Sequence, residues 1–229
     1  MNEKIILIVV AIVLIIALTI GGYKSYHYYY GKTSYSYYSN GNISSEFNYK
    51  YGKLNGIQRS YREDGSILEE TPYKNDKWDG VQKDYNKDGS ITSESPYKNG
   101  ELNGIQKYYN KDGKVYSEAS YKNGELDGIQ KYYNKDGKVY SEGSYKNGEL
   151  DGIQRMYNKD GSIASETPYK NGKLDGVQKY YSFYTEKLYI EIRYKNGKKD
   201  GIEKYYDSSG KLIKTILYKD GVIKDTKIY

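Results

Sequence analysis

One period of a tandem repeat runs Tyr121-Lys-Asn-Gly-Glu-Leu-Asp-Gly-Ile-Gln-Lys-Tyr-Tyr-Asn-Lys-Asp-Gly-Lys-Val-Tyr-Ser-Glu-Gly-Ser144, and the next begins at Tyr145 with the same Tyr-Lys-Asn-Gly. Periods of 20 to 50 residues are typical of repeat proteins, in which each unit contacts mainly its neighbours. A glycine that follows Asn or Asp and precedes Ile or Val marks the phase. It recurs every 24 residues and then once after 25, at Gly56, Gly80, Gly104, Gly128, Gly152, Gly176 and Gly201.

The composition argues against several kinds of site. The chain has no cysteine, so disulfides and thiolate metal sites are excluded. Its 36 basic and 30 acidic residues give a net charge of +6, but the two signs are interspersed along the chain. A nucleic-acid-binding tail would group its basic residues, so nucleic acid is not an expected partner. Tyrosine is the unusual feature, with 33 copies against two Phe and one Trp.

The N-terminal residues suggest a membrane segment. Residues 5–20 are uncharged, and Gly21 and Gly22 extend the run. A bilayer core requires about 20 apolar residues, with about 17 as the lower end. A cleaved signal peptide would have a basic start and small residues at the cleavage site, whereas Met-Asn-Glu-Lys is neutral and no Ala-x-Ala follows. We therefore expect residues 1–22 to form an uncleaved, single-pass transmembrane helix.

The residues after this segment divide into two parts. Residues 23–39 are rich in Tyr and Ser and are expected to form a juxtamembrane stalk, with tyrosines at headgroup level. Residues 40–229 are expected to form the repeats, about eight units when a degenerate first unit from Lys32 to Asn55 is counted. Lysines on both sides of the hydrophobic run leave its orientation open. Its likeness to an export signal favours repeats outside the cytoplasm.

Within a unit the residue pattern has a period of two, as in β-strands. Strands flank Asn110-Lys-Asp-Gly113, which suits a type I turn with glycine in the left-handed position, so each unit is predicted to be a β-hairpin. Pairing Asn110 with Lys114 sets Tyr109 opposite Val115, Gln106 opposite Glu118 and Ile105 opposite Ala119. One face is then expected to carry Ile105, Lys107, Tyr109, Val115, Ala119 and Tyr121, and the other Gln106, Glu118 and Lys122.

The link between hairpins, Lys122-Asn-Gly-Glu125, resembles a two-residue type I′ turn. A strict two-residue loop would place Ile129 on the wrong face, so a bulge is predicted at Asp127-Gly128. The three prolines occupy one phase opposite this glycine, where the backbone ladder should be broken. The sixth unit replaces its turn by Ser182–Lys187, which explains the late glycine. The prolines are Pro72, Pro96 and Pro168.

The expected fold is thus all-β: an elongated, single-sheet antiparallel array of hairpins after the N-terminal helix. The sequence contains no second sheet or further helix to cover the apolar face of such an array. Sheets of this size curl under their own twist. Curling, a second copy of the chain or a partner protein would then have to cover that face.

Candidate catalytic and metal-binding residues have simpler explanations. Glutamates recur in one phase, at Glu70, Glu94, Glu118, Glu142 and Glu166. Equivalent residues of adjacent hairpins, however, lie about 9.6 Å apart. A retaining glycosidase needs carboxylates about 5–5.5 Å apart. Each Asn-Lys-Asp-Gly turn has a single aspartate, whereas calcium requires six to eight oxygen ligands. The aspartate is explained by its preference for turns. His27 is the only histidine and lies beside the membrane segment. We expect no catalytic residues, no metal site and no cofactor.

A basic column recurs in one phase, on the face expected to carry Ile and Tyr. Two interpretations are open. The long side chains could lie along tyrosine rings with their charges in water, or the column could accept an acidic partner, a lipid headgroup or a nucleic-acid strand. Tyrosine and arginine on one face suit protein binding. The predicted interaction face comprises Lys83, Tyr85, Lys107, Tyr109, Tyr121, Lys131, Tyr133, Tyr145, Arg155 and Tyr157.

The motif Tyr-Lys-Asn-Gly-(Glu/Lys)-Leu-(Asp/Asn)-Gly, at 97–104, 121–128, 145–152 and 169–176, resembles the bacterial variant form of the MORN repeat. This form occurs in proteins described as YwqK-type antitoxins of toxin–antitoxin systems. The likeness covers roughly residues 40–225, with Gly-x-Gln where the usual repeat has Gly-x-Gly. It implies a non-enzymatic hairpin scaffold for protein or membrane contacts. An antitoxin-like or immunity-like role would make the partner a toxin, and the alternative is an anionic lipid- or nucleic-acid-binding scaffold.

Overall fold

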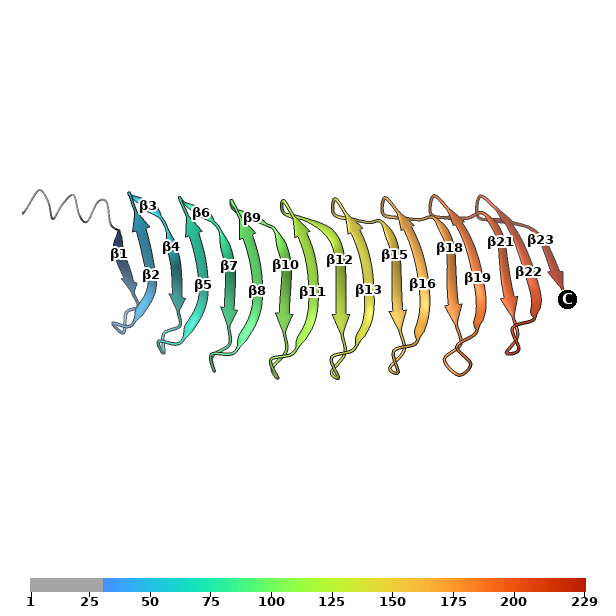
Figure 1. Ribbon diagram of the computed structural model, residues 1–229, viewed down its shortest axis with the longest axis horizontal. Coiled ribbons are helices and arrows are strands. Elements are labelled where there is room, and N and C mark those ends of the chain that lie inside the picture. The colour runs from blue at the N-terminus through green and yellow to red at the C-terminus, as the bar shows by residue number, and fades with distance from the viewer. Residues whose placement is uncertain (1–30) are drawn as a thin grey trace, which may run out of the picture. The chain divides into compact units, whose positions relative to one another are not determined.

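The computed structural model describes residues 31–229, and every regular element in this range is a β-strand (Figure 1). The expected transmembrane helix, and the stalk as far as residue 30, lie outside the described range. Between residues 31 and 229 no helix is long and apolar enough to cross a membrane. Lys32–Tyr37 forms strand β1 and pairs with β2, so the repeat array begins before residue 40.

The described residues belong to two compact units, one that extends to Ser90 and includes Tyr97–Gly100, and one of Ile91–Pro96 with Glu101–Tyr229. In each unit successive hairpins pair antiparallel, which confirms the all-β hairpin array. The first unit contains β1 (Lys32–Tyr37), β2 (Ile43–Lys50), β3 (Lys53–Leu54), β4 (Gly56–Tyr61), β5 (Ile67–Lys74), β6 (Lys77–Trp78) and β7 (Gly80–Tyr85).

The second unit repeats the same pattern of long strands, some of them preceded by a two-residue strand. It contains most of β8 (Ile91–Lys98), then β9 (Glu101–Leu102), β10 (Gly104–Tyr109), β11 (Val115–Lys122), β12 (Glu125–Tyr133), β13 (Val139–Lys146), β14 (Glu149–Leu150), β15 (Gly152–Tyr157), β16 (Ile163–Lys170), β17 (Lys173–Leu174), β18 (Gly176–Tyr181), β19 (Leu188–Lys195), β20 (Lys198–Lys199), β21 (Gly201–Tyr206), β22 (Leu212–Lys219) and β23 (Val222–Ile228).

Both predicted turns are confirmed. In the hairpin turn the Asn110 amide donates to the Lys114 carbonyl at 2.9 Å and the Gly113 amide to the Asn110 carbonyl at 3.0 Å, with a φ of 72° at Gly113. In the connecting turn Lys122 lies opposite Glu125, and the two residues between them have φ values of 50° and 83°. Two successive positive φ values define a type I′ turn. The longer turn closes with Ser182 N–H donating to Lys187 O at 2.9 Å.

The predicted register inside the hairpin is correct only beside the turn. Tyr109 lies opposite Val115, but Tyr108 lies opposite Ser117, so Tyr116 is an extra residue in a β-bulge. From there Lys107 faces Glu118, where Gln106 had been expected. The prediction was wrong because one extra residue moves every following side chain to the other face.

Two faces result, and the same assignment recurs in each hairpin. Opposite residues of paired strands point to the same side of the sheet, which assigns each residue to a face. We call one the ladder face and the other the small-residue face. In the hairpin of β10 and β11 the ladder face carries Ile105, Lys107, Tyr109, Glu118 and Ser120, and the small-residue face carries Gln106, Tyr108, Ser117, Ala119 and Tyr121.

The bulge predicted between hairpins is present at Gly128. Tyr121 lies opposite Leu126 and Ala119 lies opposite Gln130. In this interval β12 therefore has two residues more than β11. Gly128 has a φ of 117°, and a Cβ on it would lie 2.8 Å from Cβ of Ser120. Prolines stand opposite the equivalent glycines as predicted, and the nearest proline carbons would lie 2.8–3.0 Å from an added Cβ at Gly80, Gly104 and Gly176.

The core is a thin layer on the small-residue face. Ala119 is 5% exposed, and Ser117 and Ser141 are also buried. Ala119 and Gly143 occupy the same position in successive hairpins, and this column has small residues because larger side chains lie over it. A Cβ on Gly143 would meet Leu150 at 3.3 Å and Tyr145 at 3.5 Å. In other hairpins Ile192 and Ile216 fill this column. On the ladder face the apolar side chains are half-exposed or exposed, and Ile105 is 52% exposed.

Candidate functional site

The basic column lies between two glutamates on the ladder face. Arg155 bridges both neighbours: its Nε lies 3.0 Å from Oε1 of Glu166 and its Nη1 lies 3.5 Å from Oε1 of Glu142. Arg59 does the same with Glu70 and Glu46, at 2.8 and 3.5 Å. Weaker or single pairs join Lys131 to Glu118 at 3.9 Å and Lys204 to Glu191 at 3.1 Å.

A tyrosine column completes this ladder. The Tyr133 hydroxyl donates to Glu118 at 2.6 Å, and the same bond links each hairpin to the one before it. The equivalent donors and acceptors are Tyr61 and Glu46, Tyr85 and Glu70, Tyr109 and Glu94, Tyr157 and Glu142, Tyr181 and Glu166, and Tyr206 and Glu191, at 2.7–3.2 Å.

This environment changes the acidity of the ladder residues. Burial, together with the hydrogen bond to a carboxylate, raises the pKa of Tyr109, Tyr133 and Tyr157 to about 12. The hydrogen bond with Glu166 raises the pKa of Arg155. At Glu70 burial alone would raise the pKa, but hydrogen bonds from Arg59 and Tyr85 outweigh it and lower the pKa. The ladder is thus a set of charged and hydrogen-bonded groups that satisfy one another.

The predicted interaction face divides between the two faces of the sheet. Tyr121 and Tyr145 lie on the small-residue face, opposite Leu126 and Leu150. The glutamates expected on the other side share the ladder face, where Lys107 lies between Glu94 and Glu118. The basic column is therefore no uninterrupted line of positive charge. The ladder face holds the remaining eight residues: Lys83, Tyr85, Lys107, Tyr109, Lys131, Tyr133, Arg155 and Tyr157.

Sequence reasoning missed a second group of tyrosines. The rings of Tyr108 and Tyr116 lie 6.1 Å apart on the small-residue face, and those of Tyr132 and Tyr140 repeat the arrangement at 6.1 Å. Tyr116 and Tyr140 are the bulge residues, so only knowledge of the bulge reveals the pairs. We call this group the aromatic patch. Its members, exposed by 36–45%, are Tyr108, Tyr116, Tyr132, Tyr140, Met156 and Tyr189.

Turn acids serve the backbone. Oδ1 of Asp88 accepts from the Ser90 amide at 2.9 Å, and Oδ1 of Asp160 accepts in the same way from Ser162. These bonds agree with the expected turn chemistry. Within residues 31–229 no three His, Cys, Asp or Glu side chains are grouped so as to hold a metal ion. His27 lies outside the described residues.

A family model described as MORN repeat variant matches seven segments: 31–51, 54–75, 78–99, 102–123, 126–147, 150–171 and 199–220. These segments make up more than half of the chain. The chain belongs to the MORN repeat variant family. Between residues 171 and 199 this MORN repeat variant protein is not matched, and that interval contains the longer turn Ser182–Lys187.

No curated protein matches the chain. Among solved structures, the crystal structure of TcdB2-TccC3-Cdc42 is similar at 11% identity, over 84% of this chain and 13% of that chain, with a TM-score of 0.19. A mutant Tc holotoxin pore of Photorhabdus luminescens is similar at 11% identity, over 82% and 13%, with a TM-score of 0.20. The MORN repeat variant chain thus spans 13% of the length of these proteins.

Proposed function

We propose that this MORN repeat variant protein is a non-enzymatic scaffold that binds a partner protein through the aromatic patch. The observation that carries the proposal is the exposure of tyrosine pairs and a methionine on neighbouring strands of one face. Aromatic residues and Met are enriched in protein interfaces. Contiguous apolar patches on a soluble surface mark interaction sites.

The ladder face supports this choice by contrast. Most of its cations form ion pairs with glutamates of the same face, and its tyrosines donate to these glutamates. The paired cations are Arg59, Lys131, Arg155 and Lys204. The alternative, binding of anionic lipid or nucleic acid through the basic column, therefore draws no support from the geometry. Binding of that kind needs cations free to neutralise phosphates.

Two pairs of substitutions test the proposal. Tyr116→Ser with Tyr140→Ser should reduce capture of the partner from lysate by roughly tenfold, since buried aromatic anchors dominate interface energies. Ile105→Ser with Ile129→Ser is the matched control, because these side chains are about half exposed on the opposite face. Urea unfolding checks that both variants fold. Equal capture by the tyrosine variant and the wild type would contradict the proposal.

The nature of the partner and the location of the scaffold extend the proposal. The antitoxin-like role implied by the family resemblance is the case in which the partner is a toxin, and mass spectrometry of the captured protein tests it. Light scattering tests the case in which the partner is a second copy. We also propose that residues 5–20 anchor the scaffold in a membrane, with the repeats outside the cytoplasm. A mature N-terminus near residue 22 in membrane-extracted protein would contradict the anchor.

A further inference from the structure

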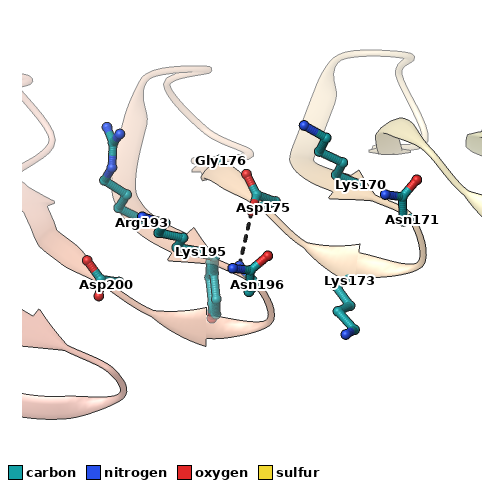
Figure 2. A pocket seen from close by; sticks show the side chains of 10 residues that line it. Lys170, Asn171, Lys173, Asp175, Gly176, Arg193, Lys195, Asn196 and Asp200 are labelled. Atoms are coloured by element: carbon teal, nitrogen blue, oxygen red, sulfur yellow. Dashed lines mark hydrogen bonds between the residues drawn. The ribbon is translucent and has the colours of Figure 1, made fainter.

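A cleft of about 600 Å³ lies along the turns that join β16 to β17 and β19 to β20 (Figure 2). Four cations line it: Lys170, Lys173, Arg193 and Lys195. We call them the basic turn cluster. Two carboxylates, Asp175 and Asp200, also line the cleft, so its charge depends on what each of these groups contacts.

The other repeats serve as an internal comparison. In the two preceding connecting turns the last residue is Glu125 or Glu149, whereas here it is Lys173, opposite Lys170. The first two connecting turns also have a lysine pair, Lys50 with Lys53 and Lys74 with Lys77. The column of Arg193 holds proline or serine in the five preceding units, with Pro168 in the unit just before it. The arginine occurs in no other unit, and it adds positive charge beside the lysine pair of this turn. Lys198, in the next turn, adds a further cation.

This added charge is not compensated within the fold. Lys170 lies opposite Lys173 and Lys195 opposite Lys198, and like charges in such pairs are unfavourable. Among the described residues no ion pair engages the four cations of the cluster.

The two carboxylates of the cleft are already engaged. Asp175 Oδ2 accepts from the Asn196 amide at 3.0 Å, the bond drawn in Figure 2. Asp200 Oδ2 accepts from Lys219 Nζ at 2.9 Å. Asp200 is thus paired with a cation from outside the cluster, and Asp175 alone remains to balance four cations, so the cleft presents an excess of positive charge.

A neighbouring change shows what compensation looks like in this array. Lys199 stands where the preceding units have leucine or tryptophan, and Glu203 stands where they have glutamine. Lys199 Nζ lies 2.8 Å from Oε2 of Glu203, which is only 3% exposed. Lys199, which replaces an apolar residue, is thus accompanied by a counter-ion within the fold. Arg193, which has no equivalent in the other units, has no ion-pair partner within the described residues, which indicates that its charge serves a ligand.

The arrangement favours a chain-like ligand. In Figure 2 Lys170 and Arg193 extend to one side of the turns and Lys173 to the other, so these three cations point in different directions. A flat membrane surface would meet only part of the set. Equivalent residues of successive hairpins are about 9.6 Å apart. A polyproline II chain repeats its side-chain direction every three residues, over about 9.3 Å.

From these observations we propose that the basic turn cluster binds an acidic segment of the partner protein, with carboxylates at every third residue. Arg193 would hold one carboxylate through its planar fork of donors, and the lysines would neutralise the next. The proposal rests on the proposed protein-binding function and adds the chemistry of the partner. It also places a second contact at the edge of the sheet, apart from the aromatic patch.

The test is fluorescence anisotropy of the full chain with a labelled peptide of Ala-Pro-Glu triplets, beside the same peptide with Gln for Glu. The variant Lys173→Glu, Arg193→Ser, Lys198→Glu restores residues found in other repeats, so it should fold. It should bind the Glu peptide at least roughly tenfold more weakly than wild type, the effect of losing about 1.4 kcal/mol. The control Lys122→Glu, Lys146→Glu, Lys159→Ser makes the same change in net charge elsewhere and should retain binding.

Three results would overturn the inference: equal binding of the Glu and Gln peptides, equal weakening by both variants, or cluster-dependent sedimentation with phosphatidylglycerol vesicles without peptide binding. The first two would show that no acidic-peptide site or only general electrostatics is present, and the third would assign the cluster to a membrane. Partner capture separates this inference from the proposed function. If the aromatic-patch variant loses the partner while the cluster variant keeps it and binds the peptide normally, only the inference fails.

Discussion

The hydroxyl of Tyr157 donates a hydrogen bond of 2.7 Å to Oε1 of Glu142, a residue of the preceding hairpin. The bond lies beside the pair of Glu142 with Arg155, one of the two residue pairs that join β13 to β15. Side chains thus reinforce the short backbone pairing between neighbouring hairpins. Because each repeat contacts mainly its neighbours, such junctions set the stability of the array.

Removing one of these junction hydrogen bonds should destabilise the protein. We expect Tyr133→Phe to lower the free energy of unfolding by about 1–2 kcal/mol, since a bond to a charged acceptor is lost and Glu118 remains partly buried. Urea unfolding measures the change. Tyr140→Phe is the control, because within the described chain that hydroxyl makes no hydrogen bond and the ring is 42% exposed. Equal losses in both variants would show that the junction bond contributes nothing.

The same tyrosines predict a loss of stability at high pH. Their pKa values in the folded protein are raised to about 12 at Tyr109, Tyr133 and Tyr157, from an ordinary value near 10. A raised pKa means that the protonated phenol stabilises the fold. This contribution is complete below pH 10 and is lost as the pH rises from about 10 to 12.

A variant with all three tyrosines replaced by Phe retains every lysine and is the control for lysine titration. Urea midpoints at pH 9, 10 and 11, together with phenolate absorbance, follow the effect. The wild type should lose stability more steeply than the variant over this interval. Parallel pH profiles of the two proteins would refute the assignment.

Glycines of two kinds should respond to substitution in opposite directions. Gly128→Val should cost about 2–3 kcal/mol, because a β-branched residue would adopt a φ of 117° with its Cβ 2.8 Å from Ser120. Lys122→Ala, at an exposed turn position, should cost less than about 0.5 kcal/mol. Thermal or urea unfolding ranks the two, and a larger loss at Lys122 would contradict the structure.

Gly143→Ala should instead stabilise the protein, by about 0.4–1 kcal/mol through the entropy of the unfolded chain. Gly143 has no positive φ, and Ala119 already occupies the same column in the preceding hairpin. The new methyl would lie 3.3 Å from Cδ2 of Leu150, a flexible side chain that has to move by a few tenths of an ångström. A loss of stability would mean that Leu150 cannot move aside.

The buried pair Lys199–Glu203 should behave as a unit. Lys199→Leu alone should cost about 2–3 kcal/mol, because it leaves a carboxylate that is 3% exposed without its cation. Lys199→Leu with Glu203→Gln restores the residues of the preceding units and should return stability to within about 1 kcal/mol of wild type. The comparison is a double-mutant cycle in urea. Additive losses would show that the two residues do not interact.

The sequence alone determined the repeating elements of this protein. Turn chemistry is local: Asn110 and Gly113 suit a type I turn with a left-handed residue, and Asn123 and Gly124 suit a type I′ turn, whatever surrounds them. The 24-residue period and the position of the junction glycine followed from the same local preferences. For this reason the hairpins, their order and the opposition of proline to glycine could all be predicted.

Only the tertiary structure decided which side chains share a face. The bulge at Tyr116 has no turn residue to mark it, and its stability depends on how Tyr108 and Ser117 pack across strands. That one extra residue places Glu118 beside Lys107 and moves Tyr121 to the opposite face, so the basic column shares its face with the glutamates. Register is a cooperative property of paired strands, and a pattern of period two in one strand cannot specify it.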